Sequence, residues 1–178
     1  SSNKMKELKV LSICYYGRGG SVFFQSLFDG HPECVTTPGT YISGYQEWFN
    51  QLKDLSTKVV IDEFCDKYKV FFDPNYVSKE ALPCCGSSPG IDLNFSRMGE
   101  SQNDSISIDE SIFRDNLLKH TKNEETQNEL SFFTALHLAY AETREMDLDK
   151  LKWIVFPLHT AMYDRAKFLN PLNTTIIH

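Results

Sequence analysis

The chain opens with an apolar run, a glycine-rich turn and an amphipathic segment, and this order constrains the fold more than any other feature. Residues 9–15 (KVLSICY) favour a strand, which the glycines of residues 17–20 end. Residues 21–28 place their apolar side chains on one face of a helix, and Asp29-Gly30 is a typical helix stop. We expect a strand, a tight turn and a helix, with the backbone N–H groups of the turn at the helix N-terminus, where an anion is favoured.

Strand and helix patterns alternate along the rest of the chain. Further strands are expected at residues 153–158 and at residues 174–177. Pro157 is unfavourable in a central strand, so we expect the first of these strands to end there. Helices are expected at residues 44–53, 57–68, 109–120, 124–144 and 160–167. This alternation favours an α/β fold with three layers, a mainly parallel sheet flanked by helices. The length of 178 residues and the lack of repeats favour one domain, residues 1–178.

Two regions depart from this alternation. Residues 74–108 carry prolines and glycines among serines and asparagines, which indicates an irregular insert or a lid on the side where an acceptor would bind. The last expected strand stops at His178 without a following turn or helix. We therefore expect a fold that is incomplete at its C-terminus, as in a fragment.

Charge and cysteine content narrow the possible functions. A net charge of −6 gives no electrostatic case for a nucleic-acid partner, although it leaves a small anionic ligand possible. The sequence has no apolar run of membrane-spanning length and no apolar signal segment. Its five cysteines lack metal-ligand spacing, so we expect free thiols, no metal site and a reduced, cytoplasmic location.

The glycine turn has the composition of a phosphate-binding turn. Its glycines allow backbone amides to approach an anion, Arg18 supplies a cation and Ser21 a hydroxyl. The ATP-binding pattern GxxxxGK[ST] is absent because no lysine precedes Ser21. The dinucleotide pattern GxGxxG is absent because Val22 stands where its third glycine would be.

The longer run of residues 17–33 (GRGGSVFFQSLFDGHPE) resembles the 5'-phosphosulfate-binding segment of sulfotransferases. These enzymes use 3'-phosphoadenosine 5'-phosphosulfate (PAPS) and release adenosine 3',5'-bisphosphate (PAP), and no metal is implied. Their turn reads Pro-[Lys/Arg]-Ser-Gly-Thr-Thr, and many members close the next helix with a small residue and His-Pro. The resemblance implies a P-loop-like sulfotransferase fold for this chain.

The resemblance also implies roles for single residues. Arg18 would contact the sulfate and the bridging oxygen, residues 19–21 would hold the 5'-phosphate, and Phe23 would lie against the adenine. The implied donor-binding set is Gly17, Arg18, Gly19, Gly20, Ser21, Val22 and Phe23. This chain departs from the family pattern with Gly17 for proline, Gly19 for serine and Val22 for the second threonine. The family's 3'-phosphate site, an arginine and a serine, would lie beyond His178.

Two residues are candidates for the base that activates the acceptor. His159 follows the strand at residues 153–158, so it should lie at the same sheet edge as the turn. Cytosolic sulfotransferases carry their catalytic histidine in a similar Lys-Thr-His-Leu-Pro segment, although Pro157 stands on the other side of the histidine here. Glu47 is the alternative, because other branches of the family use a glutamate after His-Pro. The remaining histidines are expected to be structural or superficial.

The predicted function is therefore catalytic, with Arg18 and His159 as catalytic residues. A sulfuryl group would move from PAPS to a hydroxyl or amine of a small-molecule, lipid or carbohydrate acceptor. One alternative is a non-catalytic α/β module that binds a nucleotide. A nucleotide-dependent phosphotransferase is disfavoured, because the P-loop lysine and a metal-binding pair of acids are lacking.

Overall fold

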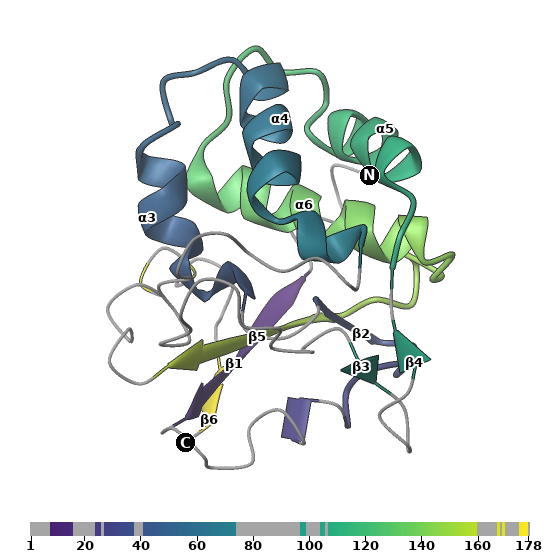
Figure 1. Cartoon of the computed structure of the whole chain (residues 1–178). Coiled ribbons are helices and arrows are strands. Elements are labelled where there is room, and N and C mark those ends of the chain that lie inside the picture. The colour runs from purple at the N-terminus through teal and green to yellow at the C-terminus, as the bar shows by residue number, and fades with distance from the viewer. Residues whose placement is uncertain are drawn as a thin grey trace.

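The computed structural model describes residues 8–15, 24–25, 27–37, 41–73, 97–98, 104–105, 107–159, 167, 169 and 175–177. These residues form an α/β fold with a parallel sheet in the order β2-β5-β1-β6 (Figure 1). The strands are β1 (Lys9–Tyr15), β2 (Cys34–Thr36), β5 (Trp153–His159) and β6 (Thr175–Ile177). A separate antiparallel pair joins β3 (Arg97–Met98) to β4 (Asp104–Ser105).

The helices of the described residues gather on one side of the sheet (Figure 1). They are η1 (Tyr41–Gly44), α3 (Tyr45–Asn50), α4 (Thr57–Lys67), η2 (Lys69–Phe71), α5 (Glu110–His120) and α6 (Glu129–Thr143). Asp109 caps α5 by accepting a hydrogen bond from the Ile112 N–H, and Asn128 caps α6 in the same way through the Ser131 N–H. Such caps satisfy backbone donors that a helix N-terminus otherwise leaves unpaired.

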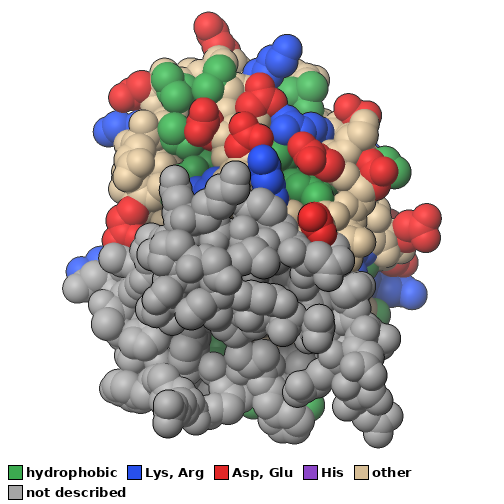
Figure 2. Space-filling view, viewed as in Figure 1, with side chains coloured by type: hydrophobic (Ala, Val, Ile, Leu, Met, Phe, Trp, Pro, Cys, Tyr) green, Lys and Arg blue, Asp and Glu red, His purple; other side chains and the backbone are tan. Residues whose placement is uncertain are grey.

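The helix α6 is the centre of this helical layer. Its residues from Phe132 to Ala141 are all buried, as expected of a helix that is apolar around its whole circumference. Phe133 packs edge-on against Phe156 of β5 and against Tyr45 of α3, so aromatic contacts join α6 to the sheet and to the other helices. The outer surface carries acidic and basic side chains close together (Figure 2), for example Arg114 of α5 with Asp62 of α4.

The two faces of the sheet bury separate sets of apolar side chains, because successive strand residues point to opposite faces. Val10, Ile154 and Phe156 belong to the large core under the helices. Ile13 and Val155 belong to a smaller cluster on the other face. Phe24 and Phe28, from the segment that follows the turn, pack against this smaller cluster. Phe24 and Phe28 therefore lie over one face of the sheet, and α3 to α6 cover the other.

Several predicted elements are confirmed. The first strand has the predicted bounds, α4 and α5 agree with prediction to within a residue, and β6 follows the predicted start by one residue. Gly30 ends the segment after the turn with a φ of 76°, a left-handed conformation that glycine adopts without strain. The predicted turn at residues 17–20, most of the helix expected at residues 160–167 and most of the insert at residues 74–108 lie outside the described residues.

The prediction that the strand ends at Pro157 is wrong, because β5 continues to His159. Trp153 donates its N–H toward Glu33, on the β2 side, and alternation along the strand places the nitrogen of Pro157 on that same side. The pairing of β2 with β5 ends at Thr36 and Val155, two residues before Pro157. Pro157 therefore removes no hydrogen bond between β2 and β5, and the pairing with β1 continues.

Three other predictions differ from the structure. The strand β2 was not predicted at all. The helix expected from residue 124 begins at Glu129, because Lys122 and Asn123 have positive φ and Asn128 provides the cap. The helix expected at residues 44–53 is shorter, with α3 covering Tyr45–Asn50 after the 3-10 turn η1.

Candidate functional site

The carboxyl ends of β1 and β5 form the best-defined candidate site. The two strands pair in parallel along their whole length, and their last residues, Tyr15 and His159, are register partners. The segment that follows Tyr15 must therefore leave the sheet next to the segment that follows His159. These two segments are the predicted donor turn and the chain around the predicted base.

The strand order makes this edge a topological switch point. From β1 the chain passes β5 to reach β2, whereas from β5 it passes β1 to reach β6 on the other side. The connections that leave β1 and β5 thus run in opposite directions across the sheet. Ligands in open α/β sheets bind in the crevice outside the carboxyl ends of such a strand pair. Topology alone therefore favours a ligand site between Tyr15 and His159.

The predicted donor-binding residues begin just beyond this edge. Residues 17–23, including Arg18, lie outside the described residues, and the chain is described again at Phe24 and Gln25. Gln25 has helical backbone conformation, as the sequence predicted, and Phe24 packs on the sheet. The described residues on either side of the predicted turn are therefore Tyr15, at the end of β1, and Phe24, which packs on the small-cluster face of the sheet.

The two candidate bases lie in different settings. His159 is the last residue of β5 and the register partner of Tyr15, the last residue of β1. Glu47 lies in the first turn of α3, where it is exposed, while its neighbours Trp48 and Phe49 are buried in the helical core. The strand register therefore places the backbone of His159 next to the end of β1, the strand that precedes the predicted donor turn.

A buried polar cluster at the end of β2 was missed by sequence analysis. Gln25 donates one amide hydrogen to Thr36 Oγ1 at 2.8 Å and the other to the Thr37 carbonyl at 2.9 Å. All three residues are at most 4% exposed. The β-branched residues of the run Cys34-Val35-Thr36-Thr37 were the available signal for a strand here. Without that strand, no pattern would have placed Gln25 beside the sheet.

Two other histidines have structural settings, as predicted. His137 is fully buried in α6, and its Nδ1 donates to the Phe133 carbonyl at 2.8 Å. Burial lowers the pKa of His137 to about 4, so the ring is neutral at physiological pH. It is a core residue.

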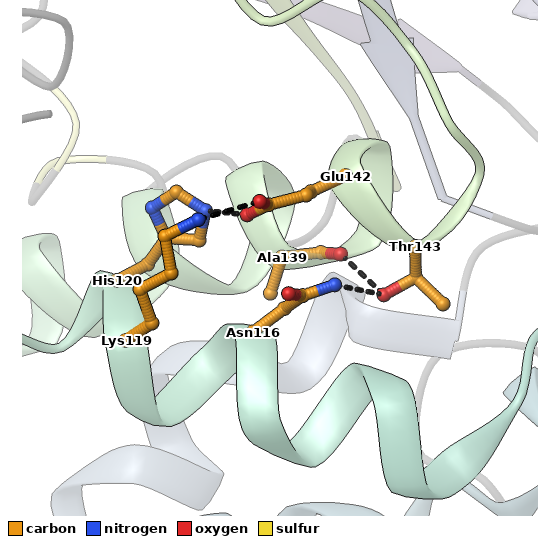
Figure 3. Close-up of polar contacts among 6 residues, drawn as sticks. All are labelled: Asn116, Lys119, His120, Ala139, Glu142 and Thr143. Carbon is orange, nitrogen blue, oxygen red and sulfur yellow. Dashed lines mark hydrogen bonds and ion pairs between the residues drawn. The ribbon is translucent and has the colours of Figure 1, made fainter.

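The second, His120, joins α5 to α6 (Figure 3). Its Nε2 lies 2.5 Å from Oε2 of Glu142, and the Lys119 ammonium lies 2.6 Å from Oε1 of the same carboxylate. One turn away, Asn116 donates to Thr143 Oγ1 at 3.0 Å. Burial lowers the pKa of His120, although the Glu142 carboxylate opposes that shift. These contacts link two helices of the outer layer and involve no residue of the sheet edge.

The described cysteines and acids give no sign of a metal centre. Within the described ranges, no three His, Cys, Asp or Glu side chains are grouped so that they could hold a metal ion. Cys14, Cys34 and Cys65 are buried free thiols, and burial raises the pKa of Cys65 to about 12. Cys84 and Cys85 lie outside the described residues.

Comparisons with protein-family models, with curated proteins and with solved structures found no match to this chain. Within the part of the chain that the structure describes, no helix is both long enough and apolar enough to cross a bilayer. A functional assignment therefore has to come from the residues and their arrangement.

Proposed function

We propose that this protein is a PAPS-dependent sulfotransferase with a P-loop-like sulfotransferase fold. The observation that carries the proposal is the parallel pairing of β1 and β5 up to Tyr15 and His159. This pairing supports a site in which the sequence GRGGS, immediately after β1, meets a histidine at the end of the neighbouring strand.

In the proposed reaction, the acceptor hydroxyl or amine attacks the sulfur of PAPS. The imidazole of His159 takes the proton of the attacking group as the new bond to sulfur forms. The bond between sulfur and the bridging oxygen of the 5'-phosphate breaks, and PAP leaves. Arg18 and the amides of the glycine turn would stabilise the negative charge that develops on the transferred group and on the bridging oxygen.

The setting of the site suits this chemistry. A histidine titrates near neutral pH, so a neutral imidazole is available as a base under ordinary conditions. The predicted turn lies in the sequence between the end of β1 and the helical residues Phe24 and Gln25, and the N-terminus of a helix favours a bound phosphate. No metal is needed in this scheme, because the arginine and the amides supply the stabilising charge.

A thermal-shift experiment tests the proposal. PAP should raise the melting temperature in a concentration-dependent way, because a ligand that binds the folded state stabilises it by mass action. ATP at the same concentrations should have a smaller effect. An equal shift with both nucleotides would favour the alternative, a general nucleotide-binding module, and no shift with either would contradict the proposed function.

A further inference from the structure

The side chain of Gln25 connects the segment after the donor turn to the sheet. Gln25 is 2% exposed, and both hydrogens of its amide are used, one by the Thr36 hydroxyl and one by the Thr37 carbonyl. Thr36 is the last residue of β2, so both acceptors lie at the carboxyl end of that strand. This is the same edge of the sheet at which β1 and β5 end.

The sequence position of Gln25 gives these hydrogen bonds their importance. Gln25 stands four residues after Ser21, the last residue of the predicted phosphate-binding set 19–21. Two other contacts hold the same segment. Phe24 and Phe28 pack against the small apolar cluster, and Asp29 pairs with Arg144, the residue after α6, at 2.9 Å. Apolar packing is not directional, and Asp29 lies near the far end of the segment.

The amide of Gln25 is thus the described directional contact nearest to the turn. Two hydrogen bonds to fixed acceptors define both the rotation and the height of the helical segment relative to β2. A binding turn has to be held in its productive geometry by supporting contacts, because any disorder in the free protein must be removed when the ligand binds.

We propose that Gln25 is a positioning residue of the donor site, with Thr36 as its partner. This inference rests on the proposed function. Gln25 would not touch the nucleotide. It would hold the start of the helix so that the N–H groups of the preceding turn are aimed at the 5'-phosphate of PAPS or PAP before either ligand arrives.

The test is the affinity for PAP, measured by titration calorimetry at a temperature where every variant is folded. Gln25→Met keeps an unbranched side chain of similar length and removes both donors. Thr36→Val removes the acceptor hydroxyl, and Thr36→Ser restores it. Asp29→Asn is the matched control, because it weakens a contact of the same segment far from the turn.

We expect Gln25→Met to weaken PAP binding about tenfold, because both hydrogen bonds that join the segment to the end of β2 are lost. Thr36→Val should weaken binding in the same direction. Thr36→Ser and Asp29→Asn should bind PAP within about twofold of the parent protein. A role in stability alone would not change affinity in fully folded protein, so this pattern separates positioning from stability.

Two results would overturn the inference, and they differ in meaning. If the parent protein binds PAP and the Gln25→Met and Thr36→Val variants bind it equally well, Gln25 does not position the site, while the proposed function stands. The same conclusion holds if Asp29→Asn weakens binding as much as Gln25→Met. If the parent protein does not bind PAP, both the proposed function and this inference fail. Should Gln25→Met not fold, the pair of Thr36 variants gives the answer.

Discussion

Tyr15 and His159 lie opposite each other at the last paired position of two adjacent parallel strands, β1 and β5. The connection that leaves β1 leads toward one edge strand, β2, and the connection that leaves β5 leads toward the other, β6. This position is therefore also the topological switch point of the fold. The relationship depends on backbone pairing alone. It places the end of the strand that precedes the predicted donor turn beside the predicted base, although the two are more than 130 residues apart in the sequence.

Replacement of His159 by alanine should reduce turnover with little effect on nucleotide binding. Loss of a general base commonly lowers the rate by about 10²- to 10⁴-fold. PAP affinity should stay within about twofold, because the base contacts the acceptor and not the bisphosphate. Release of PAP from PAPS in the presence of acceptor measures the rate. His31→Ala is the matched control, since His31 is exposed and precedes β2. Full activity in His159→Ala would show that another residue is the base, with Glu47 as the next candidate.

Replacement of Arg18 by alanine should lower both the rate of sulfuryl transfer and the affinity for PAPS. Removal of a cation that stabilises transition-state charge typically costs about 10²- to 10³-fold in rate, and PAPS affinity should also fall. Arg18→Lys keeps the charge and should retain part of the activity, because the family turn accepts either residue. Steady-state kinetics with varied PAPS measure both effects. An Arg18→Ala variant with unchanged kcat/KM would show that the turn is not the donor site.

Stability should fall as the pH is lowered from about 6.5 toward 4, in part because of His137. Burial lowers the pKa of His137 to about 4 in the folded protein, whereas the unfolded chain titrates near the ordinary value. The unfolded state therefore binds more protons over this range. One such histidine makes the free energy of unfolding decrease by up to about 1.4 kcal/mol per pH unit.

Urea unfolding from pH 7.5 to pH 4.5 measures this slope. His137→Leu should reduce it by about one proton. The prediction is contradicted if His137→Leu keeps the parent slope throughout this range.

Glu142 of α6 contacts two residues of α5, the buried His120 and the exposed Lys119, so the contributions of the two contacts to stability can be compared. Glu142→Ala leaves the buried Nε2–H of His120 without its acceptor, so it should destabilise the protein by about 1–3 kcal/mol. Lys119→Ala removes an exposed ion pair with the same carboxylate and should cost less than about 1 kcal/mol. Chemical denaturation at pH 7.5 measures both. Equal losses for the two variants would show that the buried hydrogen bond contributes no more than the surface pair.

Much of this fold could be predicted from local patterns, and the exceptions have identifiable causes. β1, α4 and α5 have strong apolar periodicity or clear end signals, and they appear where the sequence indicates. The strand β2 has only three residues, and its pairing with β5 involves residues more than 100 positions away, which no local pattern reveals. Pro157 is a strand breaker in general but is harmless here, because β2 no longer pairs with β5 at that level.

One residue of the candidate site could be predicted from the sequence, and another could not. His159 could be predicted at the sheet edge because the carboxyl ends of parallel strands share one edge. Gln25 could not, because a glutamine in an apolar helical segment carries no signal until β2 supplies its partners, Thr36 and Thr37.

Titration calorimetry with PAP and with ATP tests the proposed donor site. PAP should bind with a stoichiometry near one, ATP should bind more weakly, and Arg18→Ala should remove most of the PAP affinity. Failure of the parent protein to bind PAP, or equal binding of PAP and ATP with no effect of Arg18→Ala, would contradict the assignment of a sulfotransferase donor site at the end of β1.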